Sequence, residues 1–237
     1  ISRRFEDASG NRFYWFLDEA GELHISIGVT SAFGAVSAEK KAIDKWKELH
    51  KDNWRTLLNS AATYGTELHK CYGNVALGKN IEDMSLELMR KVAQDNGQSY
   101  DMPVKDILSF KRFTKDVSLV PLIIEGILSW QDSNTGEYLM MTIDLLAKVK
   151  VIEKRKELVQ EGFYVKGEKK GEAKLVEKTI EEEKEKIILM DFKSNFFEKD
   201  KKSFYESHLM QLIAAKKAVE QNYPEIKVDE IYNFSPN

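Results

Sequence analysis

An acid and a lysine stand at the end of a stretch typical of a buried strand. The apolar run from Ile187 to Met190 is followed by Asp191, Phe192 and Lys193. Alternate side chains of a strand share a face, so Asp191 and Lys193 point the same way. The pair predicts metal-assisted hydrolysis, in which Asp191 binds a hard divalent cation and Lys193 lies beside the water that the metal acidifies. Asp-x-Lys also occurs by chance, as a strand end with two solvated charges.

Two more carboxylates interrupt stretches with strand character. Glu125 lies in the stretch 119–130 and Asp144 in the stretch 138–151, and the turn-forming residues 133–136 join the two into a hairpin. A carboxylate in a buried strand is costly unless it is paired, hydrogen-bonded or bound to a metal. The alternative for each is a bulge or an edge position facing water, and this alternative is stronger for Glu125 than for Asp144.

His69 is a further candidate. Gly65 and Thr66 predict a close backbone approach or a helix start, and His69 follows one turn later. A lone histidine on a helix is more often structural or solvated, so periodicity alone does not make His69 a ligand.

The elements that must position these residues follow from hydrophobic periodicity. Strands are expected at 12–17, 23–27 and 228–234, and helices at 39–50, from 53 through His69, and at 81–96, 104–117 and 203–221. The core order is therefore helix, strand, strand, strand, helix, strand. The helical residues expected to face the core are Trp46, Met84, Leu88, Val92, Ile107, Leu108, Phe110, Phe113, Leu209, Leu212, Ile213 and Val219.

The segment 150–186 is different in character. It holds 11 basic and 10 acidic residues among its 37, with apolar residues in alternating stretches. This pattern predicts a protruding, solvated β-ribbon. Such a ribbon grips a substrate or a neighbouring subunit, or is simply exposed.

The composition limits the number of domains, the kinds of metal site and the partners that the chain can have. The 237 residues, 42% hydrophobic and 32% charged, favour one α/β domain with insertions. A single cysteine, Cys71, excludes an internal disulfide and any four-cysteine metal site built by this chain alone. A net charge of −3 gives no global field for nucleic acid, so such contacts need local basic patches. No apolar run approaches the roughly 20 residues of a spanning helix and there is no signal-peptide pattern, so we expect a cytoplasmic protein with no membrane partner.

Four segments, in order, carry a resemblance to a known family: GTELH (65–69), TIDLLA (142–147), MDFKSN (190–195) and HLMQLIAA (208–215). They resemble the PD-(D/E)XK nuclease superfamily, and more narrowly its RecB-like and lambda-exonuclease-like, phage-type branch. The resemblance implies a restriction-endonuclease-like α/β (α+β) core, with a central mixed β-sheet flanked by helices in the order αβββαβ. The domain 1–237 would then comprise an N-terminal hairpin with helices (1–60), helices with the first core strands (61–149), the ribbon (150–186) and the Asp191 strand, helix and last strand (187–237).

The resemblance also implies a metal site. Asp144 and Asp191 would bind Mg²⁺ or Mn²⁺, with the Phe192 backbone carbonyl as a further oxygen ligand. His69 would complete or adjoin the metal shell, and Glu125 would match an additional acidic ligand of some relatives. Asp144 and Asp191 are 47 positions apart, so the ribbon must be an insertion between adjacent strands.

Other residues would handle water and substrate. By the resemblance, Lys193 orients or helps to deprotonate the attacking water, and Gln211 buttresses the site or contacts DNA. The basic residues expected to track phosphates are Lys70, Lys79, Lys199, Lys201, Lys202, Lys216 and Lys217.

The implied function is metal-dependent hydrolysis of DNA phosphodiester bonds by an exonuclease of phage-type recombination and repair. Its expected partners are DNA, further copies of the chain in a homo-oligomer, and a single-strand-annealing or other recombination protein. Two positions depart from the branch, since Met141 stands where glycine is common and Ala215 where tyrosine is expected. These departures favour the alternative function, a catalytically weak or inactive nuclease-fold module that binds nucleic acid or a replication or recombination partner.

Overall fold

A four-stranded mixed β-sheet with helices on both faces forms the centre of the molecule. The computed structural model describes residues 2–6, 12–18, 20–36, 40–163, 165–166, 173–194 and 206–236. The sheet has the order β4 (Val120–Gln131), β5 (Tyr138–Phe163), β6 (Ala173–Phe192) and β7 (Glu230–Phe234). Neighbours are antiparallel except β6 and β7, which are parallel. The chain is therefore a mixed α and β protein, as the sequence predicts.

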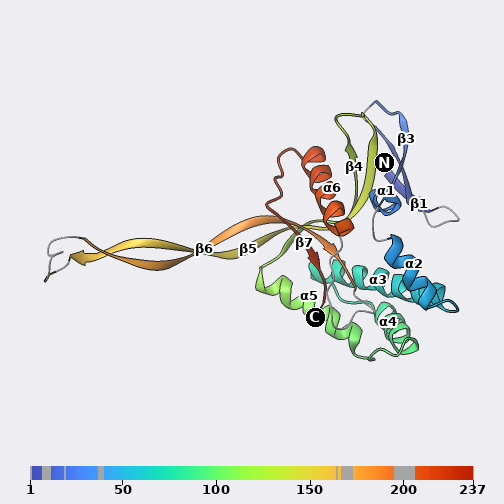
Figure 1. Cartoon of the computed structure of the whole chain (residues 1–237), viewed down its shortest axis with the longest axis horizontal. Helices are drawn as coiled ribbons and strands as arrows, with labels where there is room; N and C mark the ends of the chain where they lie inside the picture. The colour runs from blue at the N-terminus through green and yellow to red at the C-terminus, as the bar shows by residue number, and fades with distance from the viewer. Residues whose placement is uncertain are drawn as a thin grey trace.

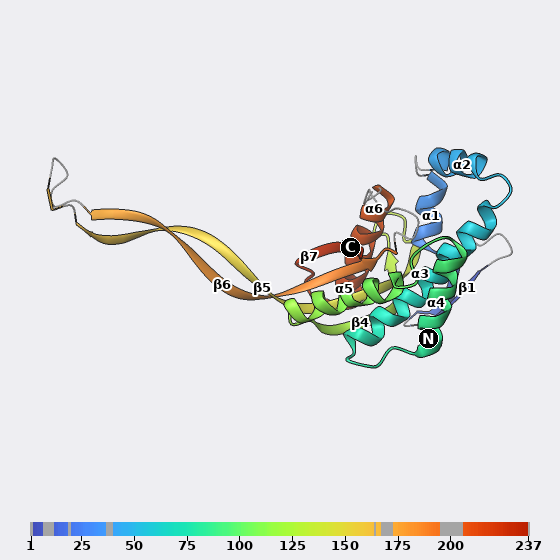
Figure 2. The ribbon, with the colours of Figure 1, turned by 90° about the horizontal axis from the view of Figure 1, so that it is seen from below.

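Helices cover the two faces of this sheet (Figures 1 and 2). On one face α3 (Trp54–Ala76), α4 (Asp83–Asp95) and α5 (Met102–Asp116) share a core with Leu145 and Met190. On the other, α1 (Val29–Val36) and α6 (Glu206–Asn222) pack against Leu146 and Leu189. Between α1 and α3 lies α2 (Lys40–Leu49). No helix in the described parts of the chain is long and apolar enough to cross a bilayer.

A second sheet of three antiparallel strands lies beside the first. It consists of β1 (Ser2–Glu6), β2 (Arg12–Leu17) and β3 (Leu23–Ile27), with β2 in the middle. Its inner face packs Tyr14 and Phe16 against Met140 of β5. An isolated bridge between Gly28 and Met140 fixes its place on the central sheet. The sequence predicts β2 and β3 but not the polar strand β1.

The charged segment forms a two-stranded arm that projects far from the body (Figures 1 and 2). β5 and β6 continue their pairing from Lys148 opposite Ile187 out to Phe163 opposite Ala173. Cross-strand ion pairs line it, for example Lys154 to Glu181 at 2.7 Å and Lys156 to Glu177 at 2.6 Å. The ribbon is thus an insertion between strands that are adjacent in the sheet, as the spacing of the two aspartates requires.

The expected inward stripe of α4 is wrong by one position. Met84 is 79% exposed and Leu88 is 39% exposed, while Ser85, Met89 and Ala93 are buried. The physical cause is a polar contact, since Ser85 Oγ donates a 2.6 Å hydrogen bond to Glu67 Oε2 of α3. Because a buried carboxylate must be hydrogen-bonded, Ser85 turns inward and rotates the stripe.

Other expected core positions also lie at the surface. Leu108, Leu209 and Ile213 are exposed, because each stands at the edge of a helical stripe whose centre fills the contact with the sheet. Trp46 is half-buried and packs against His50 rather than anchoring a core cluster. Of the remaining expected residues, Ile107, Phe110, Leu212 and Val219 are buried, and Val92 and Phe113 are partly buried against the core beneath α3, α4 and α5.

Candidate metal centre

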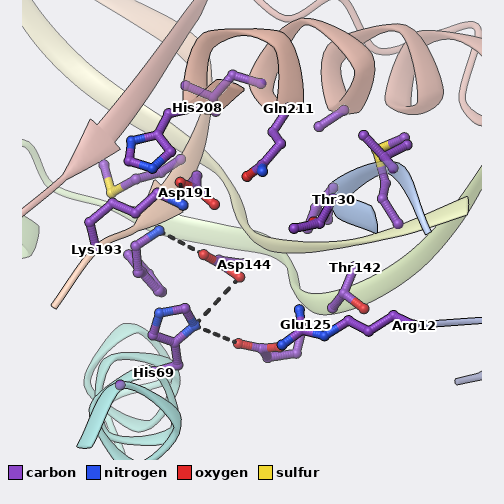
Figure 3. Close-up of a pocket in the computed structure, with 18 of the residues that line it drawn as sticks. Arg12, Thr30, His69, Glu125, Thr142, Asp144, Asp191, Lys193, His208 and Gln211 are labelled. Carbon is purple, nitrogen blue, oxygen red and sulfur yellow. Dashed lines mark hydrogen bonds and ion pairs between the residues drawn. The ribbon is translucent and has the colours of Figure 1, made fainter. Parts of the chain in front are cut away.

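A cavity of about 710 Å³ opens where α3 and α6 approach the ends of the central strands. Its wall includes six of the residues selected from the sequence, which come from α3, β4, β5, β6, the segment after β6, and α6. They are His69, Glu125, Asp144, Asp191, Lys193 and Gln211. Figure 3 shows these side chains around one space.

Three of these side chains form a group able to hold a metal ion. One ligand atom from each of His69, Glu125 and Asp144 lies within 4.8 Å of the others. His69 Nδ1 is 3.5 Å from Asp144 Oδ1 and 3.6 Å from Glu125 Oε1 (Figure 3). Two carboxylates with one imidazole form a donor set that suits divalent cations.

A local irregularity in the sheet directs the two carboxylates toward His69. Glu125 has φ of 50°, in the left-handed region that favours glycine. It lies opposite Asp144, because Ile124 pairs with Leu145 and Gly126 with Ile143. Residues two positions apart on one strand normally share a face, but Ile143 packs on the α6 face of the sheet and Leu145 packs on the α3 face. The register shift of this strand pair lies earlier, between Pro121 and Ile123, so Glu125 is not the bulge that the alternative interpretation suggests; it belongs to the group able to hold a metal ion.

Asp144 is also fixed to the neighbouring strand. Its Oδ2 accepts a 2.6 Å hydrogen bond from the backbone amide of Phe192. The Phe192 ring is buried and makes edge contacts with Tyr72, Phe110 and Phe234. Because this aromatic cluster holds the end of β6, it also fixes the distance between Asp144 and the strand that carries Asp191.

Asp191 and Lys193 face the same cavity, as their alternation on a strand predicts. Lys193 Nζ lies 2.6 Å from Asp191 Oδ2, and about a quarter of each side chain is exposed, 23% and 24% respectively. Burial raises the pKa of the Asp191 carboxyl to about 6, against the opposing effect of Lys193 and with added repulsion from Asp144. A cation bound between the two aspartates would relieve both burial and repulsion.

His69 carries the positive charge of this group. Burial lowers its pKa, but hydrogen bonds and charge attraction from Asp144 and Glu125 outweigh burial and raise it to about 10. The positive charge of the imidazolium thus offsets the negative charges of the two carboxylates, as the charge of a bound divalent cation would. The donor set fits a hard or borderline divalent ion, with the carboxylates as the charged ligands and neutral His69 as a ligand or neighbour.

Helix α6 forms the opposite wall. Gln211 points into the cavity, with His208 one turn earlier (Figure 3). Met141 and Ala215, which depart from the pattern of the resembled nuclease branch, are both buried and line the cavity. Gly65 lies within α3 rather than at its start, and its position faces Ser194, 3.7 Å from an added Cβ.

The basic residues expected to track phosphates are not all free to do so. Lys70 lines the cavity but forms a 2.6 Å ion pair with Glu67. Lys216 donates to the Val228 carbonyl and lies 3.5 Å from Glu220, away from the cavity. Lys217 lies over the Trp130 ring and Lys79 is exposed beyond α3. Lys199, Lys201 and Lys202 lie outside the described residues.

The cavity also contains residues that the sequence does not single out. Arg4 and Arg12 reach it from the N-terminal sheet, and Thr30 from the start of α1. Tyr14, beside them, has its hydroxyl 3.3 Å from Thr142 Oγ1. No spacing signal links these residues to the acidic positions, because only the packing of β2 on β5 brings them together.

One further group among the described residues has metal-ligating side chains. Asp18, Glu22 and His24 stand at the β2–β3 turn, with His24 Nε2 2.9 Å from Asp18 Oδ2. His24 and Asp18 already pair with each other and do not line the cavity. A variant in this group is therefore a suitable control for metal binding at the cavity.

The geometry of the site stands without support from relatives. Comparisons with family models, with curated proteins and with solved structures found no match to this chain.

Proposed function

We propose that the chain is a divalent-metal-dependent nuclease that hydrolyses DNA phosphodiester bonds, and that it acts as an exonuclease of phage-type recombination and repair. One observation carries the proposal: the metal-binding group of His69, Glu125 and Asp144 shares a cavity with the Asp191–Lys193 pair. Acidic ligands beside a lysine are the components that hydrolysis of a phosphodiester needs.

Asp144, Asp191 and Glu125 would hold Mg²⁺ or Mn²⁺, with the Phe192 carbonyl as a further oxygen ligand and His69 in or beside the shell. When bound, the ion supplies Lewis acidity, lowering the pKa of water and neutralising phosphate charge. The left-handed Glu125 supports this assignment, because strained backbone persists where the surrounding structure requires it and collects at functional sites.

The chain's own groups have separate tasks in this proposal. The Lys193 ammonium, held beside Asp191, donates hydrogen bonds to the attacking water or to a non-bridging phosphate oxygen as negative charge develops there. Gln211 faces the same space from α6 and orients the substrate by hydrogen bonds. Buried Met141 and Leu189 exclude bulk water from the floor of the cavity.

The fold adds a second line of support. Strands β4, β5 and β6 form an antiparallel run, and α6 connects β6 to the parallel strand β7. We propose that this arrangement is a restriction-endonuclease-like core, with Asp144 on its second strand and Asp191 at the end of its third.

A module that binds nucleic acid without cleaving it is the second candidate. It is favoured by Met141 and Ala215, which line the cavity in place of the glycine and tyrosine of the resembled branch. Both replacements change the shape of the substrate space without removing a ligand.

Cleavage of end-labelled DNA separates the two candidates. Linear and circular substrates, double- and single-stranded, are incubated with Mn²⁺, Mg²⁺ or EDTA. Loss of linear but not circular DNA, only with metal, supports the exonuclease. Binding without turnover on every substrate refutes it and supports the binding module, and cleavage of circular DNA replaces exonuclease with endonuclease.

A further inference from the structure

The N-terminal sheet presents an apolar face to solvent. Strand pairing places three rows of side chains on the face opposite Tyr14 and Phe16. Leu23 is 62% exposed and Ile25 is 66% exposed, whereas single sheets normally alternate apolar inside with polar outside. We call this surface the outer sheet face; its rows are Phe5, Phe13 and Ile27, then Arg3, Trp15 and Ile25, then Leu17 and Leu23.

The far end of the arm presents another exposed apolar surface. Leu158 is 68% and Leu175 53% exposed, and they share a face because Leu158 pairs with Glu177 and Gln160 with Leu175. Phe163 and Val165, at the end of β5 and just beyond it, are 62% and 78% exposed. We call these four residues the arm tip.

Neither surface is explained by the single chain. A two-stranded ribbon has no core of its own and is marginally stable in water, and exposed ion pairs add only about 0–1 kcal/mol each. Such pairs line the arm along its length, from Lys150–Glu183 near the body to Lys156–Glu177 and Lys178–Glu161 near the tip. Large apolar residues at the tip oppose solvation, and contiguous apolar surface of this kind marks an interaction site.

The positions of the two surfaces indicate that each is covered by a second copy of the chain. The arm projects from one side of the body, and the N-terminal sheet lies toward the opposite side (Figure 1). A twofold rotation across the long axis therefore lays each arm along the body of a second copy, with its tip toward that copy's sheet. We infer that the chain forms a closed dimer in which the arm tip of each copy docks on the outer sheet face of the other.

The buried area agrees with a reciprocal contact. The 13 residues from Val151 to Phe163 span ~43 Å at roughly 3.3 Å per residue, and a ribbon face is about 10 Å wide. One arm that packs along its whole length against the body and sheet of the second copy would bury roughly 850 Å² counting both sides, below the ~1,200–2,000 Å² of a stable interface, whereas two such arms would bury roughly 1,700 Å². Mutual exchange of both arms is what reaches a stable size.

Charge is compatible with this docking. The arm face that carries Leu158 holds three glutamates (177, 181 and 183) and two lysines (154 and 156), an excess of one negative charge. Arg3 is the charged residue within the rows of the outer sheet face. The two surfaces thus carry opposite net charges and attract weakly.

The test is the mass of the full chain in solution, measured by sedimentation velocity across a concentration series without DNA. The wild type is expected to be a dimer. Leu158→Glu with Leu175→Glu disrupts the arm tip, and Ile25→Glu disrupts the outer sheet face; each is expected to weaken dimerisation by about tenfold or more. Because all three side chains are mostly exposed, folding should be retained, as circular dichroism checks. Met84→Glu, at a side chain that is 79% exposed and lies on neither surface, is the control and should stay dimeric.

Mixing the two disrupted variants identifies the partner surfaces. A heterodimer of the arm-tip variant with the sheet-face variant keeps one intact contact, whereas each homodimer keeps none. The mixture is therefore expected to associate more tightly than either variant alone. Lack of recovery would overturn tip-on-sheet docking, since tip-to-tip pairing gives that result. A wild type that stays monomeric, or variants that dimerise as well as wild type, would overturn the dimer itself. DNA cleavage does not enter this readout, so the inference stands or falls apart from the proposed function.

Discussion

The backbone amide of Phe192 donates a 2.6 Å hydrogen bond to Asp144 Oδ2, which ties the two acid-bearing strands together at the site. The other oxygen of the same carboxylate lies 3.5 Å from His69. One Asp144 oxygen therefore holds the fold while the other faces the proposed metal. This division predicts that structure and metal binding can be separated at one residue.

Asp144→Asn is expected to keep the fold but lose metal affinity. The asparagine carbonyl can still accept the Phe192 hydrogen bond, while the loss of a charged ligand weakens binding of a hard cation. Titration calorimetry with Mn²⁺ should show affinity at least about tenfold lower, the usual scale for perturbing a metal site. His24→Ala, in the group at the β2–β3 turn, is the control and should bind Mn²⁺ as wild type does. Unchanged affinity in Asp144→Asn would place the ion elsewhere.

The left-handed backbone at Glu125 predicts an unusual order of stability. A non-glycine residue in this region costs roughly 1–2 kcal/mol, so Glu125→Gly should be more stable than Glu125→Ala by about 1 kcal/mol after the greater chain entropy of glycine is counted. Urea unfolding of the two variants measures this difference. Both lack the carboxylate, so both should bind Mn²⁺ more weakly than wild type. Alanine more stable than glycine would show that the position is not strained.

Asp106 predicts how stability changes with pH. Burial raises the pKa of this carboxyl to about 6, against the effect of the 2.6 Å hydrogen bond from Tyr64. Between the unfolded pKa of 3.8 and about 6, the folded state binds the proton more tightly than the unfolded state does. This group's contribution is therefore full below pH ~4, falls as pH rises and is lost above pH ~6, by up to about 3 kcal/mol.

Asp106→Asn isolates this effect, because asparagine is neutral at every pH and can still accept the Tyr64 hydrogen bond. The stability of the variant relative to wild type should rise between pH 4 and 6 and then stay level, as denaturant unfolding at each pH measures. A constant difference across that window would mean that Asp106 titrates normally. Asp106 does not line the cavity of the metal-binding group, so Mn²⁺ affinity should not change.

The sequence predicts those parts of the site that rest on local pattern. A buried apolar run ending in Asp191 and Lys193 fixes their strand and shared face, and the charged segment 150–186 predicts the ribbon. Pairing of Leu145 with Met190 then brings Asp144 near Asp191 across the base of that ribbon.

Features that depend on tertiary packing cannot be predicted from the local sequence pattern. The register of α4 is set by the need of buried Glu67 for the Ser85 hydroxyl, a contact between two helices. The left-handed Glu125 has no local signature, because glutamate gives no preference for that conformation. Arg4 and Arg12 reach the cavity from a separate sheet, so their spacing along the chain carries no signal.

Asp191 and Lys193 are proposed to act together with a metal ion in phosphodiester hydrolysis. The initial rate of cleavage of end-labelled linear duplex DNA with Mn²⁺ is measured for wild type, for Lys193→Ala and for the control Lys105→Ala, which removes an exposed lysine of α5 outside the cavity. We expect metal-dependent cleavage by wild type and by the control, and a rate lower by about 10²-fold or more for Lys193→Ala, the usual range for a group of this kind. Cleavage by Lys193→Ala at the wild-type rate would contradict a role of Lys193 in the hydrolysis.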